Sequence, residues 1–429
     1  MKRLVAILLV LVMAGCLWSA AAEGRPFEGK VLHVAHRNTG PEGDAMQAQY
    51  NAFEELTGCK IDVEVLATNA DEAESVLLVR AATGNLPDVF TTNIGAKLQE
   101  MDPQANMLDL SDCEWLDNLN PNYRNIVTDA ETGAVWGTPI GSSNVAGVFY
   151  NKEIYSNLGL EIPTTWEAFI ANCAVIREAG IDPVSSPFAT AAGCQLLVLM
   201  QYYYVAQEDP DFAGKYTLKE AALHDSPAYM RGLEKLAELY EKGYINSDPL
   251  STAIQDSARA LAEGTAAMCI NRTNIISSVL SVKPEAVDNI GFFPLPDLDP
   301  ENRGVTIWMP HAYVVSQNTK EPELAKALLE FLTTQEAIDI YCSKCTPTGA
   351  FMLNGVMPSG DVANATKEAQ EWASKASVPA MEYICPIKGS NMATILSMVG
   401  TGQYTPEDGV KEIEMDNEID AQQKGMKGW

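Results

Sequence analysis

"GVFYNKEIYSNLGLEIPTTWEAF", residues 147–169, is the stretch of sequence that decides how this chain folds. An apolar strand over 147–149 meets Tyr150-Asn151-Lys152, which leads into a short helix that ends at a glycine turn. Pro163 then sets the conformation of a loop, and Thr164 or Thr165 caps the helix that follows. The stretch therefore redirects the chain between elements, and it contains no recognisable catalytic residue.

The segment before this stretch alternates strands and helices. Residues 30–36, 60–67 and 86–93 read as strands, and the amphipathic segments between them read as helices. This alternation predicts a largely parallel sheet with helices on both faces. Sites in such sheets lie in the loops beyond the C-terminal ends of the strands. Here those loops are 36–40, 91–95 and 141–144.

After residue 150 the pattern becomes mainly helical, and short strands return between 266 and 315. No internal repeat of the kind that builds solenoids and no low-complexity linker interrupts the chain. Two α/β lobes that share strands and have no flexible tether imply that the chain passes between them more than once.

The N-terminus reads as a secretory signal. Lys2 and Arg3 precede an apolar run over 4–13, which is too short to span a bilayer. Met13-Ala14-Gly15-Cys16 resembles a lipobox, so we expect cleavage before Cys16 and lipidation of its thiol. Ala20-Ala21-Ala22 before Glu23 is the alternative, an ordinary cleavage site; the signal is assigned to residues 1–22.

Charge and length narrow the class of protein. Removing the signal takes two of the 29 basic residues and none of the 57 acidic ones, so the formal net charge becomes 27 − 57 = −30. Such a surface repels nucleic acid and anionic headgroups. A mature chain of about 400 residues also exceeds what one hydrophobic core normally holds, which predicts two domains.

The cysteines do not predict a metal site or a required disulfide. Eight remain besides Cys16, and several, such as Cys173 and Cys269, lie in apolar periodic segments where a thiol packs as a small hydrophobe. Cys342-Ser343-Lys344-Cys345 is a single CxxC, and no second pair supplies the remaining ligands of a zinc site. We expect neither a metal nor a cofactor.

Five motifs, in order, resemble one known family. They are "ATGNLPDVF" (82–90), the opening stretch, "ALAEGTAAMCIN" (260–271), "IGFFPLP" (290–296) and "VVSQNTKEPELAKALLEFL" (314–332). Each is weak alone, but their order and spacing are similar to those of the family 1 extracellular solute-binding proteins, the maltose-binding-protein-like receptors of bacterial ABC sugar importers. The resemblance covers residues 29 to about 345.

The resemblance implies a two-lobed periplasmic-binding-protein-like α/β fold, with a mostly parallel sheet in each lobe and a hinge that the chain crosses several times. It places 29–148 plus 291–332 in lobe 1 and 149–290 plus 333–429 in lobe 2. The expected crossings lie near 145–150, near 287–291 and after Phe331. Tyr150 and Trp166 are then packing residues beside the hinge.

The resemblance also implies a function. The chain would be a monomer that captures a sugar or oligosaccharide between its lobes and delivers it to ABC permease subunits, without catalysis. It would be anchored by lipid at the extracellular side of the membrane or lie in the periplasm. Family positions carried over give the ligand contacts His36, Arg37, Asn38, Thr92, Asn93, Ser143, Asn144, Arg272, Asn274 and Trp308.

One position departs from the family pattern. Maltose-binding relatives carry a tryptophan where Asn274 stands, so a linear glucan ligand is in doubt. Trp308 is a replacement aromatic face or a core residue. The cluster 202–204 of three tyrosines is more readily explained by packing than by ligand contact.

Two other function classes stay open. A glycoside-processing enzyme would need two carboxylates facing one bond, but no GxSxG, Walker, GxGxxG or HExxH motif is present. A receptor that presents its ligand to a sensor, or a surface glycan-binding protein, would use the same fold without transport.

Overall fold

The computed structural model describes residues 25–37, 40–67, 70–358, 360 and 362–429. Cys16, both candidate cleavage sites and Asn38 lie outside these ranges. Within them, no helix combines the length and the apolar character needed to cross a membrane.

The first sheet has the strand order β2-β1-β3-β10-β4. Its strands are β1 (Val31–Arg37), β2 (Lys60–Leu66), β3 (Val89–Thr92), β4 (Gly137–Pro139) and β10 (Ala312–Val315). The first three run parallel to one another, as their alternation with helices predicted, and β10 is antiparallel to β3 and β4.

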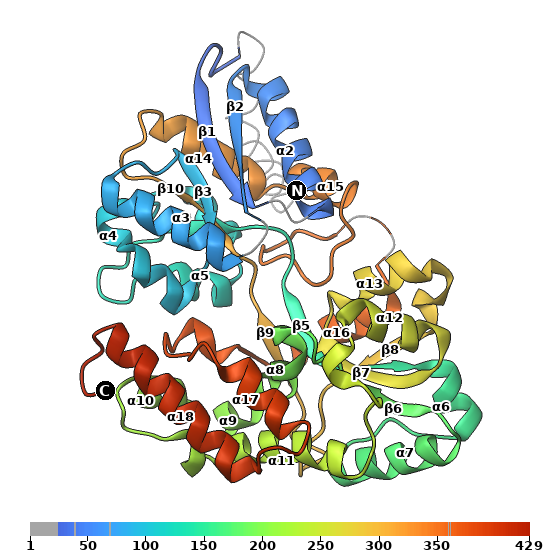
Figure 1. Ribbon diagram of the computed structural model, residues 1–429. Coiled ribbons are helices and arrows are strands. Elements are labelled where there is room, and N and C mark those ends of the chain that lie inside the picture. Colours follow the sequence, from blue (N-terminus) through green and yellow to red (C-terminus); the bar gives the residue numbers. More distant parts are fainter. Residues whose placement is uncertain (1–24, 38–39, 68–69, 359, 361) are drawn as a thin grey trace, which may run out of the picture.

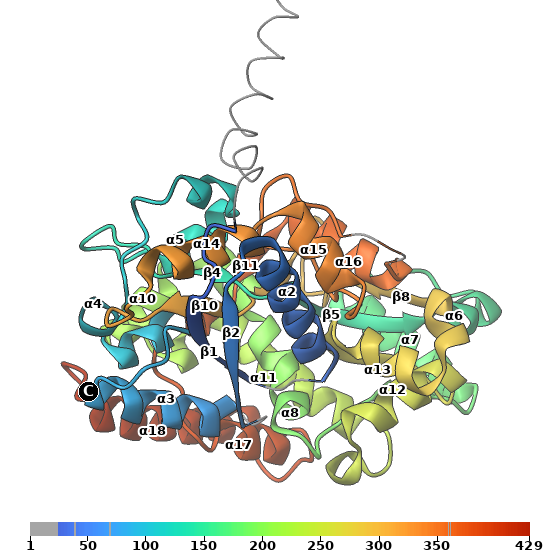
Figure 2. The same cartoon turned by 90° about the horizontal axis from the view of Figure 1, so that it is seen from above.

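The helices of this lobe pack on the sheet and on each other (Figures 1 and 2). They include α2 (Pro41–Thr57), α3 (Ala70–Thr83), α14 (Pro322–Leu332) and α15 (Gln335–Cys342). Helix α2 is followed by Gly58 as its C-cap, whose φ of 77° is left-handed and suits glycine. Tyr50 of α2 is fully buried, and its hydroxyl donates to the hydroxyl of Tyr313 on β10.

The second sheet is mixed. Its order is β11-β9-β5-β7-β6, and β8 also pairs with β5. The strands are β5 (Asn144–Asn151), β6 (Asp182–Ser185), β7 (Ala266–Arg272), β8 (Ile290–Phe293), β9 (Val305–Trp308) and β11 (Ser377–Pro379). Because β5 runs antiparallel to β7, β8 and β9, this sheet differs from the mostly parallel one we expected.

Helices from distant parts of the chain cover the second lobe. In Figure 1, α6 (Lys152–Leu158) and α7 (Trp166–Glu178) lie at one end of it, and the C-terminal α17 (Met392–Val399) and α18 (Pro406–Gln423) lie at the other. Helix α17 packs on α8 (Ala191–Met200), and α18 packs on α11 (Pro227–Glu241).

The chain crosses between the sheets three times. The first crossing, 140–143, joins β4 to β5, and the second, 309–311, joins β9 to β10. The third lies between α15, which packs on α2, and α16 (Asn364–Lys375), which packs on β8.

Three expected placements are therefore wrong. The first crossing lies at 140–143 and not near 145–150, because β5 pairs with β7, β8 and β9 from Asn144 onward, which places 144–148 in the second sheet. The chain does not cross at 287–291, because β8 forms hydrogen bonds with β5 and keeps "IGFFPLP" in the second sheet. The segment 335–342 stays with the first sheet instead of passing to lobe 2, because α15 packs on α2. The other lobe boundaries remain a prediction.

The opening stretch folds as its residues indicate. The Asn151 side chain accepts from the backbone N–H groups of Glu153 and Ile154 and caps α6. Thr165, not Thr164, accepts from the N–H of Ala168 and caps α7. Gly147 lies where an added Cβ would be 2.4 Å from the Phe292 ring and 2.8 Å from the backbone oxygen of Phe293, so the close approach of β8 favours glycine here.

Tyr150 and Trp166 are packing residues, as predicted. Tyr150 lies 5.5 Å from Phe293 between ring centroids. Trp166 stacks on Phe169, and its indole N–H donates to Glu238 at 2.7 Å. The three tyrosines at 202–204 are likewise buried in the core of the second lobe.

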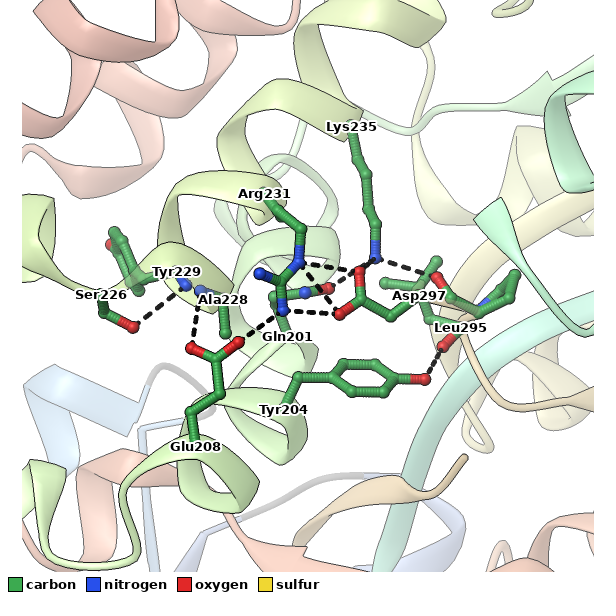
Figure 3. Close-up of polar contacts among 11 residues, drawn as sticks. Gln201, Tyr204, Glu208, Ser226, Ala228, Tyr229, Arg231, Lys235, Leu295 and Asp297 are labelled. Atoms are coloured by element: carbon green, nitrogen blue, oxygen red, sulfur yellow. Dashed lines mark hydrogen bonds and ion pairs between the residues drawn. The ribbon is translucent and has the colours of Figure 1, made fainter. Parts of the chain in front are cut away.

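A buried ion cluster fastens this region (Figure 3). Asp297, in the loop after β8, is 4% exposed and accepts two hydrogen bonds from Arg231 Nε and one from Arg231 Nη2. Lys235 Nζ lies 2.8 Å from the same carboxylate. The backbone carbonyl of Asp297 accepts from the N–H of Trp166. The cluster therefore joins α11, the start of α7 and the loop after β8.

The cysteines within these ranges form no disulfide. Cys173 and Cys269 are fully buried, and burial raises the pKa of both thiols, to about 12 for Cys269. They act as small core residues, as the sequence predicted.

Candidate functional site

A cavity of about 290 Å³ lies between the two sheets. Residues at strand ends of both lobes line it, together with residues of the crossings 140–143 and 309–311. Five of the predicted contact residues line it: Arg37 at the end of β1, Asn93 after β3, Asn144 at the start of β5, Arg272 at the end of β7 and Trp308 at the end of β9.

The other predicted residues do not line this cavity. His36 is buried edge-on against Tyr50, and Thr92 donates to Glu74 at 2.9 Å. Ser143 donates to the carbonyl of Ala350, and Asn274 precedes α13 (Ile275–Val282). Asn38 lies outside the described residues.

Strand geometry explains this division. Successive side chains of extended backbone point to opposite faces. In each neighbouring pair that we predicted, at 36–37, 92–93 and 143–144, the second residue lines the cavity and the first is buried. The sequence located the strand ends but did not distinguish the two faces there.

Several lining residues were not predicted. Lys97 belongs to the 3-10 helix η1 (Gly95–Met101), which begins at the end of the predicted loop 91–95. Because Lys97 follows that loop by only two residues, the sequence could have indicated it as a lining residue. His311 lies in the crossing 309–311. Glu382 and Tyr383 come from η6 (Met381–Tyr383), beyond every motif that we recognised.

Trp308 is both a core residue and part of the cavity wall. It is 7% exposed, and its indole N–H donates to Glu382 Oε1 at 2.9 Å. The guanidinium carbon of Arg272 lies 5.7 Å from its ring centroid. This distance allows a cation–π contact, so Arg272 covers part of the aromatic face.

Glu382 is held as a carboxylate. Burial alone would raise its pKa, but the ammonium of Lys388 at 3.2 Å, the Trp308 indole and the charge of Lys97 together lower it. Its negative charge is therefore compensated by groups of the protein.

Three cations face the cavity without an ion pair of their own, although the charge of Glu382 acts on Arg272 from a greater distance. In the part of the chain that the structure describes, no carboxylate oxygen lies within 4.0 Å of the charged nitrogens of Arg37, Lys97 or Arg272. The Nε of Arg272 is buried and has no hydrogen-bond partner. Burial lowers the pKa of Arg272, but a guanidinium remains charged near neutral pH.

The same charges act on His311. Burial, followed by repulsion from Arg37, Lys97 and Arg272, lowers the pKa of its imidazole to about 4. The ring is therefore neutral at pH 7. No group of three or more His, Cys, Asp or Glu suited to a metal ion occurs among the described residues.

Comparisons with known proteins agree with this architecture. Residues 38–339 match the sequence profile of the family described as "Bacterial extracellular solute-binding protein". The melibiose/raffinose/stachyose-binding protein of Bacillus subtilis (strain 168) is 25% identical over 333 residues, which are 75% of this chain and 73% of that protein. The multiple sugar-binding protein of Streptococcus mutans is 25% identical over 77% of each chain.

A solved structure supports the fold. A chitin oligosaccharide binding protein superimposes with a TM-score of 0.74 at 20% identity, over 92% of this chain and all of that one. The two-lobed α/β architecture is thus that of known binding proteins.

Proposed function

This chain belongs to the bacterial extracellular solute-binding protein family, and from this premise we propose that it captures a carbohydrate between its lobes and delivers it to an ABC importer. Its ligand contacts would be Arg37, Asn93, Asn144, Arg272 and Trp308, joined by Lys97 and other lining residues. We further propose that the receptor acts as a monomer and releases its ligand unchanged.

The observation that carries the proposal is a polar cavity lined from both lobes. Sugars are bound by planar polar groups that pair with adjacent hydroxyls and by aromatic faces that contact the ring. Asn93 and Asn144 supply amide groups, and Trp308 and Tyr383 supply rings. The cavity is near the lower end of small-molecule sites, and the names of two relatives specify sugars.

A thermal-shift screen with a carbohydrate panel tests the proposal. A ligand that binds only the folded state stabilises it, by about 2.7 kcal/mol at a hundred times its Kd. We expect at least one carbohydrate to raise the unfolding temperature, and Asn93→Ala to reduce that shift. Asn125→Ala, an exposed asparagine of the same lobe outside the cavity, is the control and should leave the shift unchanged. If amino acids or peptides stabilise the protein and no carbohydrate does, the proposed ligand class is wrong.

We also propose that Cys16 carries lipid and anchors the receptor at the extracellular side of the membrane. The support is the lipobox-like Met13-Ala14-Gly15-Cys16 directly after the apolar run. Stable anchoring needs more than one acyl chain. Mass spectrometry of the N-terminal peptide should find an acylated Cys16; an unmodified peptide that begins at Glu23 would contradict the anchor.

A further inference from the structure

We propose that the carbohydrate bound in the interlobe cavity is acidic, and that Arg272, together with Arg37 and Lys97, holds a carboxylate on it. This inference rests on the proposed function and narrows its ligand class.

Arg272 provides the first argument. Its side chain lies at the end of β7 against Trp308, with Nε buried and without a hydrogen-bond partner. Burying a charge without a counter-charge is costly, so buried cations in proteins are normally paired. A cation kept here without an ion-pair partner among the described residues indicates an anion that the ligand supplies.

The second argument is the number of cations without an ion pair that gather in one place. The chain has 57 acidic and 29 basic residues, so an acidic partner is readily available to most basic side chains. Arg37 and Lys97, which reach the cavity from the first lobe, still form no ion pair within the described ranges. Their charges and that of Arg272 all contribute to the low pKa of His311.

The carboxylates of the wall do not remove this excess. Glu382 is already matched by Lys388 and the Trp308 indole. Glu42 accepts a hydrogen bond from Tyr341 at 3.3 Å and is the other acidic residue in the lining. The lining therefore carries three cations and two carboxylates, and one of these carboxylates, Glu382, is already paired with Lys388 outside the lining. The net charge of the lining is positive.

The same geometry disfavours a neutral sugar stacked on Trp308. The guanidinium of Arg272 covers part of the ring face that such a sugar would need. A guanidinium can instead grip a carboxylate with two parallel hydrogen bonds.

Calorimetric titration with matched saccharide pairs tests the inference. The probes are galacturonic acid with galactose and glucuronic acid with glucose, each as monosaccharide and short oligosaccharide, plus glucose 6-phosphate and galactose 6-phosphate. We expect a uronic acid to bind at least tenfold more tightly than its neutral counterpart. In Arg272→Met, its affinity should fall roughly tenfold to hundredfold, as expected for the loss of charge-assisted hydrogen bonds.

The variants separate recognition from folding. Arg272 has no ion-pair partner among the described residues, so Arg272→Met without ligand should unfold at the same temperature as the wild type or higher. Lys97→Gln changes an exposed residue, so the variant should fold, and it should weaken uronate binding less than Arg272→Met does. If Arg272→Met does not fold, the uronate affinity of Lys97→Gln tests the inference in its place. Arg259→Met removes an exposed arginine of α12 (Ile254–Glu263), outside the cavity, and should change nothing.

Equal or tighter binding of a neutral sugar would overturn the acidic ligand and leave the proposed function standing. Binding of a sugar phosphate in preference to both uronic acids would overturn the carboxylate. If no saccharide, acidic or neutral, binds in these titrations or in the wider panel, the proposed function fails and the inference fails with it.

Discussion

At the scale of single residues, the cavity depends on which side of an extended backbone each side chain occupies. Arg37, Asn93 and Asn144 reach the cavity, while the residues before them are buried. Such a choice follows from the local twist and packing of a strand end, which a motif does not encode. For these three strand ends, the family resemblance therefore located the residue that lines the cavity only to within one position.

Gly141 provides a residue-scale prediction, because it lies in the first crossing with a φ of 60°. An added Cβ would be 2.5 Å from the Tyr341 hydroxyl and 3.1 Å from Glu42. Gly141→Ala should therefore lower the free energy of unfolding by about 2 kcal/mol or more, from the left-handed backbone and the displaced tyrosine. Urea denaturation measures the loss.

Gly133→Ala is the matched control. Gly133 has a φ of 77° but open space around it, so its substitution adds backbone strain without a clash. We expect about 1 kcal/mol. Equal losses in the two variants would show that Tyr341 yields at no cost and that close packing does not constrain this crossing.

At the scale of elements, the sequence predicted the parts with a clear period. In β1, Leu32 and Val34 are buried while Val31 and His33 are exposed, so the strand was visible from alternation. In β8 all four residues are buried, so its pattern could not say which sheet it joins. The short η6, which carries Glu382, has neither period nor motif, and only tertiary packing brings it to the cavity.

The buried ion cluster around Asp297 gives a prediction at the scale of elements. Asp297→Asn would leave Lys235, whose side chain is 3% exposed, without its buried counter-charge. Breaking a buried pair from one side costs about 3–5 kcal/mol, so the variant should lose that much free energy of unfolding at pH 7. Asp117→Asn, which removes an 88% exposed carboxylate from its pair with Arg124, should cost less than about 1 kcal/mol.

The ion pairs of Asp297 can also be tested by pH. The quantity to follow is the difference in free energy of unfolding between the wild type and Asp297→Asn. Burial would raise the pKa of Asp297, but Arg231 and Lys235 outweigh it and hold the pKa below its ordinary value of 3.8. A lowered carboxyl pKa stabilises the fold above pH 3.8 and loses that contribution as the pH falls through the folded-state value. The difference in free energy of unfolding between the wild type and Asp297→Asn should therefore become smaller below pH 3.8. A difference that stays constant would contradict the ion pair.

At the scale of the whole molecule, the crossings form a compact connection between the two lobes. Segments 140–143 and 309–311 run antiparallel, and the N–H of Ile140 donates to the carbonyl of His311 at 2.9 Å. The third connection joins them through a bridge between Ser142 and Phe351. Two-lobed proteins close by changing a few backbone dihedrals at such junctions. These residues are therefore where we expect the molecule to bend.

The charges that line the cavity affect the balance between the open and closed states. Arg37 and Lys97 belong to the first lobe and Arg272 to the second, so like charges face one another across the cavity and oppose its closure. A bound anion attracts both sides and favours the closed state by its extra contacts there. Small-angle scattering should therefore give a smaller radius of gyration with the carbohydrate that most raises the unfolding temperature. A saccharide without a thermal shift is the control, and an unchanged scattering profile at saturation would contradict closure.

In Arg272→Met, an acidic ligand at saturation should produce less closure than in the wild type, because the second lobe no longer binds the carboxylate.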